Sequence, residues 1–185
     1  MKIWRELLGY VKLLVIVVAI ILVINNVVLI NAKIPSPSME KTLMVKDRLF
    51  GFRVAYGINL NLFGHEISEK FKDPKRFDIV IFKYPDDESR LFIKRVIGLP
   101  GEVVEIKDGK VYIDGSPTPL DDSFIPEKMI GSYGPYTVPE NCYFMLGDNR
   151  NDSKDSRLWK NKFVRFDQLV GKAVIRYYPS FKWLG

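Results

Sequence analysis

The sequence predicts a mainly β protein, built from antiparallel sheet, that follows one N-terminal transmembrane helix. Residues 13–30 form a long apolar run, and beyond Ala32 the chain breaks into short segments rich in valine, isoleucine, phenylalanine and tyrosine. Turn signals such as Asp108-Gly109 separate these segments. Outside the apolar run no long stretch has helical periodicity, and closely spaced strands joined by turns favour antiparallel sheets over βαβ units.

The apolar run at residues 13–30 is interrupted only by Asn25 and Asn26. As a helix it spans roughly 27 Å, close to the thickness of a bilayer core. It is longer than the apolar part of most cleaved signal peptides, and no small residue stands two positions before Ala32, where cleavage favours one. A permanent anchor is therefore favoured over a cleaved signal peptide.

The distribution of charge predicts the orientation of this anchor. Lys2, Arg5 and Lys12 precede the core of the run and favour a cytoplasmic N-terminus. The basic residues that follow belong to a long domain, and long domains cross a membrane largely regardless of charge. We therefore expect residues 1–32 to be a cytoplasmic tip and single transmembrane anchor, and residues 33–185 to be a domain on the outer face.

Seven segments beyond the anchor have the composition of strands. They are residues 48–54, 77–82, 91–97, 102–106, 110–113, 143–146 and 170–178. Two longer stretches are expected to be irregular excursions from the sheet. Residues 58–73 are polar, and residues 116–139 are rich in proline, glycine, aspartate and serine.

Composition argues against several kinds of site. Cys142 is the only cysteine, which excludes an intramolecular disulfide and a multi-thiolate zinc site, and its neighbours suggest a small residue of a buried strand. His65 is the only histidine, so a two-histidine metal site is excluded, and its loop-like surroundings argue against a catalytic role. The net charge of +6 includes no lysine/arginine block, so nucleic-acid binding is not expected, whereas a mild attraction to anionic lipid is.

Ser38 is a candidate nucleophile because of where it lies and what flanks it. It follows the anchor by a few residues. Pro35 and Pro37 precede it, and Met39 follows it. The prolines fix φ and restrict the residues before them, which holds a hydroxyl and nearby N–H groups in a set geometry. Oxyanion holes need donors of this kind. An ordinary Pro/Ser linker leaving the membrane is the alternative.

Lys94 is a candidate base for that serine. A lysine can take a proton from serine if burial among apolar groups lowers its pKa toward neutrality. Strand alternation places Lys94 on the same face as Phe92 and Val96, which is the desolvating setting required. The alternative is a surface lysine that extends its amine into solvent beside Arg95.

Residues 147–157 form a polar segment that follows the strand expected at residues 143–146. The segment is dense in turn formers and in side chains that can hydrogen-bond. A rigid polar loop at the end of a strand is a common place for catalytic support. A generic acidic turn or a calcium loop is the alternative, although the glycine and terminal glutamate of an EF-hand loop are missing.

These segments together resemble the sequence boxes of bacterial type I signal peptidases, which are serine–lysine dyad peptidases. Residues 35–43 are similar to the serine box, residues 76–82 to the next strand box, residues 94–102 to the lysine box and residues 147–157 to the final box. The resemblance runs in order across nearly the whole chain, anchor included. It implies a mainly antiparallel, barrel-like β catalytic domain with an apolar face resting on the membrane.

The resemblance implies the roles of the central residues. Ser38 is the nucleophile and Lys94 is the general base. The oxyanion hole is formed by the Ser36 hydroxyl and the Ser38 backbone N–H. The reaction is peptide hydrolysis through an acyl-enzyme, for which no metal and no cofactor is needed.

Three further matches and two departures surround the dyad. Ser153 is expected to hydrogen-bond and orient Lys94, and an ion pair between Asp155 and Arg157 is expected to support the loop. Lys41 replaces the proline that usually follows the serine box, which puts the local stiffness in doubt. Phe77 replaces the glycine that usually precedes Asp78, and is expected to add an apolar contact at the domain surface.

The resemblance also implies substrates, partners and a location. The substrates are exported preproteins, cut after a small residue at an Ala-x-Ala-like site. The partners are these preproteins and the lipid bilayer, near the protein-export channel, in the bacterial plasma membrane. Apolar residues near the dyad in sequence are expected to line shallow substrate pockets: Ile34, Pro35, Met39, Leu43 and Ile93.

Features of the sequence disfavour three rival interpretations. A self-cleaving repressor of the serine–lysine class is disfavoured by the anchor and by the loop at residues 147–157. A homologue that binds signal peptides without cutting them is disfavoured by intact Ser38, Lys94 and Ser153. A eukaryotic-type signal peptidase subunit is disfavoured because it has histidine where this chain has Lys94.

Overall fold

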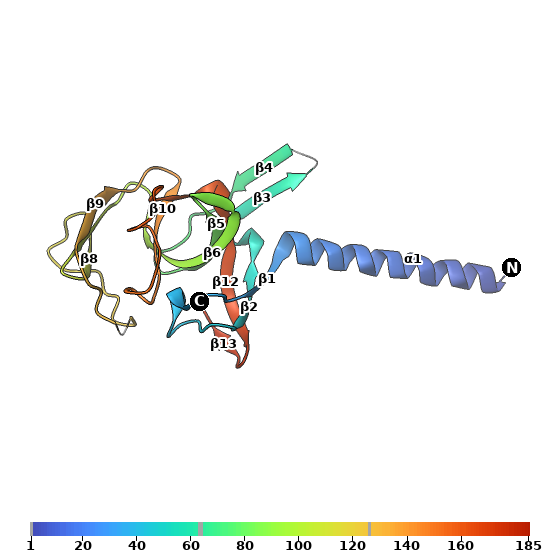
Figure 1. Cartoon of the computed structure of the whole chain (residues 1–185). Helices are drawn as coiled ribbons and strands as arrows, with labels where there is room; N and C mark the ends of the chain where they lie inside the picture. The colour runs from blue at the N-terminus through green and yellow to red at the C-terminus, as the bar shows by residue number, and fades with distance from the viewer. Residues whose placement is uncertain (1, 63–64, 126) are drawn as a thin grey trace.

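The computed structural model describes residues 2–62, 65–125 and 127–185. It consists of one long helix and a β domain, and the helix projects away from that domain (Figure 1). Helix α1 covers Lys2–Val23 and continues into a π-helical turn, η1, at Ile24–Val28. The segment Trp4–Val28 is long and apolar enough to cross a membrane, and none of its most apolar stretch is buried in the protein. Asn26 donates its side-chain amide to the carbonyl of Leu22, which satisfies that polar group within the helix.

The sheet begins where the helix ends. Strand β1, Leu29–Lys33, pairs antiparallel with β2, Arg48–Phe52, from the first residue after the helix. The boundary expected after Ala32 therefore lies inside β1, and residues 29–32 belong to the sheet. The side chain of Ile30 is buried, so this junction is part of the packed domain and not a free linker.

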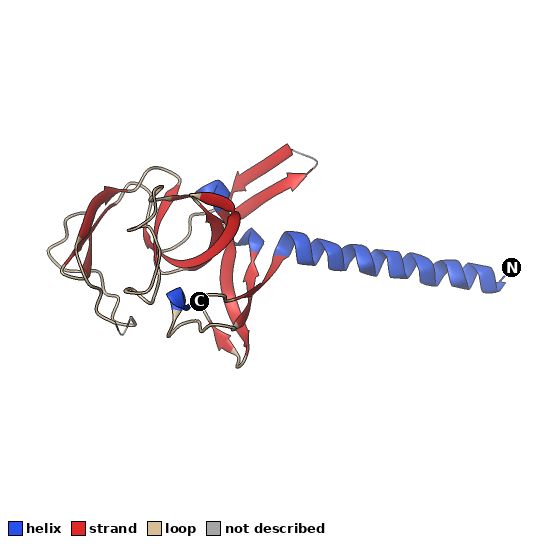
Figure 2. Ribbon diagram, viewed as in Figure 1, coloured by secondary structure: helices blue, strands red, loops and turns tan. Residues whose placement is uncertain are grey.

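The main sheet is antiparallel and carries the remaining long strands. Its order is β1-β2-β12-β5-β6-β10-β11, with β13 pairing β12. The bounds are β5 Ile79–Tyr84, β6 Asp87–Gly98, β10 Cys142–Leu146, β11 Val164–Arg165, β12 Leu169–Tyr178 and β13 Lys182–Trp183. Short 3-10 helices are η2 Pro37–Met39, η3 Arg53–Ala55 and η4 Phe166–Gln168. The predicted fold class, mainly antiparallel β with one N-terminal apolar helix, is confirmed (Figure 2).

Two stretches expected to be irregular contain strands. Residues 58–73 hold all but the first residue of an antiparallel hairpin of β3, Gly57–Leu62, and β4, His65–Lys70, which projects from the domain on the side of the helix (Figure 1). Residues 116–139 include β9, Tyr133–Thr137, which joins β7, Val103–Lys107, and β8, Lys110–Ile113, in a separate sheet. The alternation of Ile58, Leu60 and Leu62 with asparagines carried the strand signal in the first stretch.

The turn predicted between β7 and β8 is confirmed. Asp108 and Gly109 have φ values of 48° and 78°, the left-handed geometry that a two-residue hairpin needs. Cys142 opens β10 and is only partly buried, so it packs at the edge of a core cluster.

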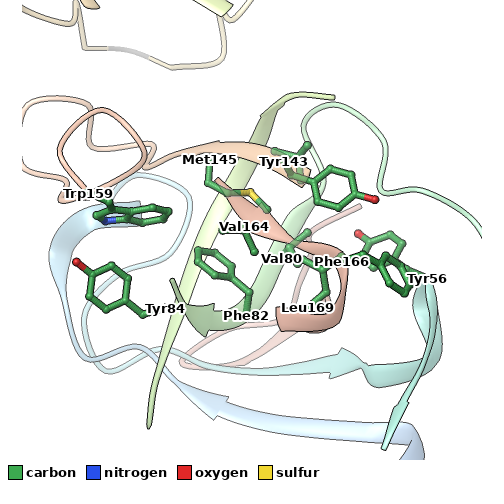
Figure 3. Packing of buried hydrophobic residues seen from close by; sticks show 11 residues of the cluster. Tyr56, Val80, Phe82, Tyr84, Tyr143, Met145, Trp159, Val164, Phe166 and Leu169 are labelled. Carbon is green, nitrogen blue, oxygen red and sulfur yellow. The ribbon is translucent and has the colours of Figure 1, made fainter. Parts of the chain in front are cut away.

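Three clusters of buried apolar side chains support the sheet. The largest lies against β5, β6, β10 and β12, with Trp159 and Tyr84 at one end and Tyr56 and Phe166 at the other (Figure 3). A second cluster packs the serine-bearing segment onto β1, β2, β5 and β12. The third joins β6, β7 and β10. Burial on this scale fixes β6, the strand of Lys94, between two packed clusters.

Candidate active site

Ser38 is held by a short segment that is anchored in the core. Pro37 begins the 3-10 helix η2, and Ser38 is the central residue of that helix, with 7% of its surface exposed. Met39 and Leu43 are completely buried on its C-terminal side. A flexible linker would not bury these side chains, so the alternative of an ordinary Pro/Ser linker is wrong.

Lys94 reaches Ser38 from the middle of the sheet. It lies in β6 opposite Val80 of β5, and only 3% of its surface is exposed. Its Nζ lies 2.5 Å from Ser38 Oγ and 3.1 Å from the carbonyl oxygen of Ile93. Two residues that are 56 positions apart in the sequence are therefore in hydrogen-bond contact, and the alternative of a solvent-exposed lysine is wrong.

Burial lowers the pKa of Lys94 to about 8, because the charged ammonium loses its hydration. The carboxylates of Asp155 and Asp148 oppose this effect, since each stabilises the ammonium. A substantial fraction of the lysine is then neutral slightly above pH 7, and a neutral amine 2.5 Å from a hydroxyl can accept its proton. The pair has the geometry and the protonation behaviour of a nucleophile and its base.

Ser36 lies beside the nucleophile. Its Oγ is 3.3 Å from Ser38 Oγ, and its side chain is exposed. A hydroxyl at this distance can reach an oxygen that develops on a carbonyl attacked by Ser38. The position agrees with the expected contribution of Ser36 to an oxyanion hole.

The loop at residues 147–157 is braced by a buried ion pair. Asp155 is completely buried and accepts two hydrogen bonds of 2.7 Å from Arg157, one from Nε and one from Nη2. The same carboxylate accepts the N–H of Gly147 at 3.1 Å, and Arg157 also donates to the carbonyl of Arg150 at 2.6 Å. The expected pair is confirmed, and it closes the loop from its first residue to its last.

The loop also clamps the serine segment. The backbone N–H of Asn149 donates to the carbonyl of Ser38 at 3.1 Å, and its side-chain amide donates to that of Pro37 at 3.3 Å. A Cβ on Gly147 would approach the Ser38 carbonyl oxygen to 2.5 Å and would come closer still to Ser153 Oγ. Only glycine permits this close passage of the two backbones.

The expected hydrogen bond from Ser153 to Lys94 is not formed. The Oγ of Ser153 is buried and has no hydrogen-bond partner among the described residues. The donors of Lys94 are directed at Ser38 and at the Ile93 carbonyl instead. Ser153 lies close to Gly147 and hence to the serine segment, but it does not hold the lysine in this state.

A second buried ion pair, which was not expected from the sequence, joins the segments of Ser38 and Lys94 to the loop at residues 147–157. Arg95 donates Nε and Nη2 to the two oxygens of Asp148, at 2.8 and 2.5 Å. Thr42 donates its hydroxyl to the same carboxylate at 2.5 Å. Strand alternation alone could have indicated that Arg95 faces away from Lys94, although its partner lies 53 residues further on.

The two departures from the resemblance have conformational consequences. Lys41 has a φ of 76°, a value that a proline ring does not allow, so the chain turns differently here from a prolyl segment. Phe77 has a φ of 72°, where glycine is favoured. Its ring makes the expected apolar contact, an edge-on packing at 5.1 Å against Phe124, which in turn covers the guanidinium of Arg95 at 4.8 Å.

A cavity of about 510 Å³ opens in front of the dyad. Of the five expected pocket residues, Pro35 and Ile93 line it. Ile34, Met39 and Leu43 do not, because they are fully buried in the core cluster that anchors the serine segment. The remaining lining comes from the segment at residues 36–38, from residues 90–92 of β6, and from Lys94, Asp152 and Lys154. His65 begins β4, and its side chain lies outside the described residues.

The family model and the similar proteins of known name indicate the same family. Residues 7–178 match the family model described as signal peptidase, peptidase S26. The chain is 40% identical over 152 residues to a probable signal peptidase I-2 of Synechocystis, with 79% of this chain and 62% of that protein covered. It is 33% identical over 187 residues to a probable signal peptidase I-1 of the same organism, with 97% and 87% covered.

Two further matches come from other organisms. Signal peptidase I of Pseudomonas fluorescens is 33% identical over 192 residues, with 85% of this chain and 67% of that protein covered. A solved structure of a signal peptidase I from Enterococcus faecalis has 35% identity and a TM-score of 0.47, with 55% of this chain and 97% of that chain covered. The chain thus belongs to the signal peptidase family, peptidase S26.

Proposed function

We propose that this protein is a membrane-bound serine endopeptidase that removes signal peptides from exported preproteins, with Ser38 as nucleophile and Lys94 as general base. The observation that carries the proposal is the 2.5 Å contact between the buried amine of Lys94 and Ser38 Oγ. Membership of the signal peptidase family supports the substrate class. Cleavage follows a small residue, at an Ala-x-Ala-like site.

In the first half of the reaction, neutral Lys94 takes the proton of Ser38 as Oγ attacks the scissile carbonyl. Negative charge then develops on the carbonyl oxygen. The Ser36 hydroxyl and the Ser38 N–H stabilise that charge, which is the interaction that strengthens in the transition state. The charged Lys94 then gives its proton to the leaving amine, so that the mature protein departs and an ester on Ser38 remains.

In the second half, Lys94 acts as base again. It accepts a proton from water, the water attacks the ester carbonyl, and the same two donors stabilise the second oxyanion. Protonation of Ser38 Oγ releases the signal peptide and regenerates the dyad. Every proton in this cycle is carried by Lys94, and no step needs a metal or a cofactor.

The anchor sets where this reaction takes place. The helix at Trp4–Val28 is long enough to cross a bilayer, and β1 starts directly after it. The helix therefore tethers to the membrane the domain that carries the cavity. We infer that the N-terminus is cytoplasmic and that the catalytic domain acts on the outer face of a bacterial plasma membrane, near the export channel that delivers preproteins.

The test uses the full chain in detergent with a labelled preprotein, and identifies the product by sequencing its new N-terminus. Ser38→Ala and Lys94→Ala should each abolish cleavage, and the double variant should be no worse than either, because each residue is useless without the other. Lys110→Ala is the matched control, since Lys110 is exposed on β8. Substantial cleavage by Lys94→Ala would refute the assigned base. Binding of the preprotein without any cleavage would favour a signal-peptide receptor.

A further inference from the structure

One face of β6 carries a row of three side chains that begins at the dyad. Strand alternation places Lys94, Phe92 and Arg90 on the same face, and all three line the cavity. The strand is paired with β5 along one edge, but β10 pairs with the other edge only at residues 95, 96 and 98. Within the described part of the chain, the second edge of residues 90–93 has no strand partner. An extended peptide can add to an open edge of this kind.

The far end of this row holds two cations on an aromatic platform. The rings of Tyr84 and Phe92 are stacked at 4.4 Å with an interplanar angle of 1°. The guanidinium of Arg90 lies 5.3 Å from the centre of the Phe92 ring, and the ammonium of Lys154 lies 5.6 Å from that of Tyr84. Aromatic faces attract both cations to this spot without neutralising their charge.

Neither cation has a carboxylate within salt-bridge distance among the described residues. Asp152 is the one carboxylate on the cavity lining, and it pairs with neither. Asp86 and Asp87 lie outside the lining, where Asp86 interacts electrostatically with Lys154 and Asp87 with Arg90, although neither forms a salt bridge. The oxygens of Asp86 accept hydrogen bonds from the Tyr84 hydroxyl and from two backbone N–H groups, and Asp87 accepts two from Ser89. The lining of the cavity therefore presents two cations that form no salt bridge in the described part of the chain, against the one carboxylate of Asp152, with the carboxylates of Asp86 and Asp87 just outside it.

We propose that Arg90 and Lys154 form a subsite for an acidic side chain of the preprotein, about four residues from the scissile bond. The spacing follows from the strand, because four residues of β structure cover about 13 Å. A substrate strand that runs beside β6, with its scissile carbonyl at Ser38 and Lys94, advances by the same amount. The subsite rests on the proposed function, and it adds a charge preference that the dyad alone does not supply.

The test compares peptides that carry aspartate, glutamine or lysine at one position, three to five residues from the cut, on either side. At low salt, kcat/KM should be about fivefold higher for aspartate than for lysine at one of these positions, and the preference should shrink as salt is added. Arg90→Glu and Lys154→Glu should each weaken the preference, and the double variant should reverse it. Lys110→Glu, a charge reversal at an exposed site away from the cavity, should leave it unchanged.

Binding provides a readout that does not depend on cleavage. The dissociation constants of the same peptides are measured on Ser38→Ala protein, with and without the two charge reversals. An aspartate preference that reverses with them supports the subsite even if cleavage fails, and so separates it from the proposed catalysis. Equal affinities for aspartate and lysine peptides at all tested positions would overturn it. So would a charge effect that appears only with anionic vesicles and ignores the peptide, since the cations would then bind lipid headgroups.

Discussion

The burial of Lys94 predicts that its amine destabilises the folded protein at neutral pH. Burial lowers the pKa of this lysine from 10.5 to about 8. Each unit of difference corresponds to about 1.4 kcal/mol, so the charged lysine costs about 3 kcal/mol of folding free energy below pH 8. Lys94→Met removes this cost and replaces the amine by an apolar chain of similar length. The lost hydrogen bond to Ser38 opposes the gain by about 1 kcal/mol, which leaves a net stabilisation of about 2 kcal/mol at pH 7.

The sign of the pH dependence is fixed by the same pKa. Between pH 8 and 10.5 the unfolded chain binds more protons at Lys94 than the folded protein does. The stability of the native protein relative to Lys94→Met therefore rises with pH through this window, and the advantage of the variant is lost before pH 10.5, where the lost hydrogen bond leaves the wild type more stable. Inactive but more stable protein is the expected outcome at pH 7.

The assay is urea unfolding of the full chain in detergent at a series of pH values from 7 to 11. Tryptophan fluorescence monitors the unfolding. Trp159 is 1% exposed in the main core cluster and reports on its loss. Lys110→Met, at an exposed lysine of β8, should show no such stabilisation. A Lys94→Met protein that is less stable than wild type at pH 7, or a difference that does not change with pH, would refute the reasoning.

Three other predictions concern residues around the dyad and the start of the sheet. Ser36→Ala should lower kcat about 100-fold with little change in KM, because its hydroxyl matters once the oxyanion develops. Gly147→Ala should abolish processing and lower the Tm, because the added Cβ would meet the Ser38 carbonyl at 2.5 Å. In thermal unfolding in detergent, a variant starting at Val28 should remain cooperative. One starting at Lys33 should lose about 2 kcal/mol or more, because most of β1 is missing.

Each of these has an outcome that contradicts it. A raised KM with intact kcat would make Ser36 a substrate-binding residue. Full activity of Gly147→Ala would show that the loop does not pass this close to the serine segment in solution. Equal stability of the two shortened proteins would show that β1 contributes little to the sheet.

The pairing of Ser38 with Lys94 was indicated by the resemblance and not by either segment alone. The prolines around Ser38 and the apolar neighbours of Lys94 left alternatives open, and the resemblance of the segments, in their order, connected the two residues. The ion pair of Asp155 with Arg157 was also predictable, since the two residues are neighbours in one short loop. The antiparallel fold class followed from short strands and turn signals.

Contacts between residues far apart in the sequence could not be predicted from local sequence patterns. The pair of Arg95 with Asp148, and the contact of Thr42 with that carboxylate, depend on how the loop at residues 147–157 folds back onto β6. Apolar residues near Ser38 in sequence could equally line a cavity or fill the core. Met39 and Leu43 fill the core and thereby anchor the serine segment. Tertiary packing determines this placement, and local sequence does not reveal it.

The strand signal at residues 57–70 was present but weak. Polar residues at alternate positions lower the mean hydropathy of the hairpin, so the stretch looked like a loop. Backbone hydrogen bonding between β3 and β4 holds the hairpin as a two-stranded sheet separate from the main sheet. Ser153 illustrates a different limit, since a match in sequence did not determine where its hydroxyl is directed.

The dependence of kcat/KM on pH tests the dyad most directly, because its acidic limb reports the pKa of the essential base in the free enzyme. Cleavage of a labelled preprotein peptide by the full chain in detergent should rise with an apparent pKa of about 8, the value set by burial of Lys94. Lys94→Met should be inactive at every pH. A limb near the ordinary pKa of histidine, about 6.5, or cleavage by Lys94→Met at any pH, would contradict the assignment of Lys94 as the base of Ser38.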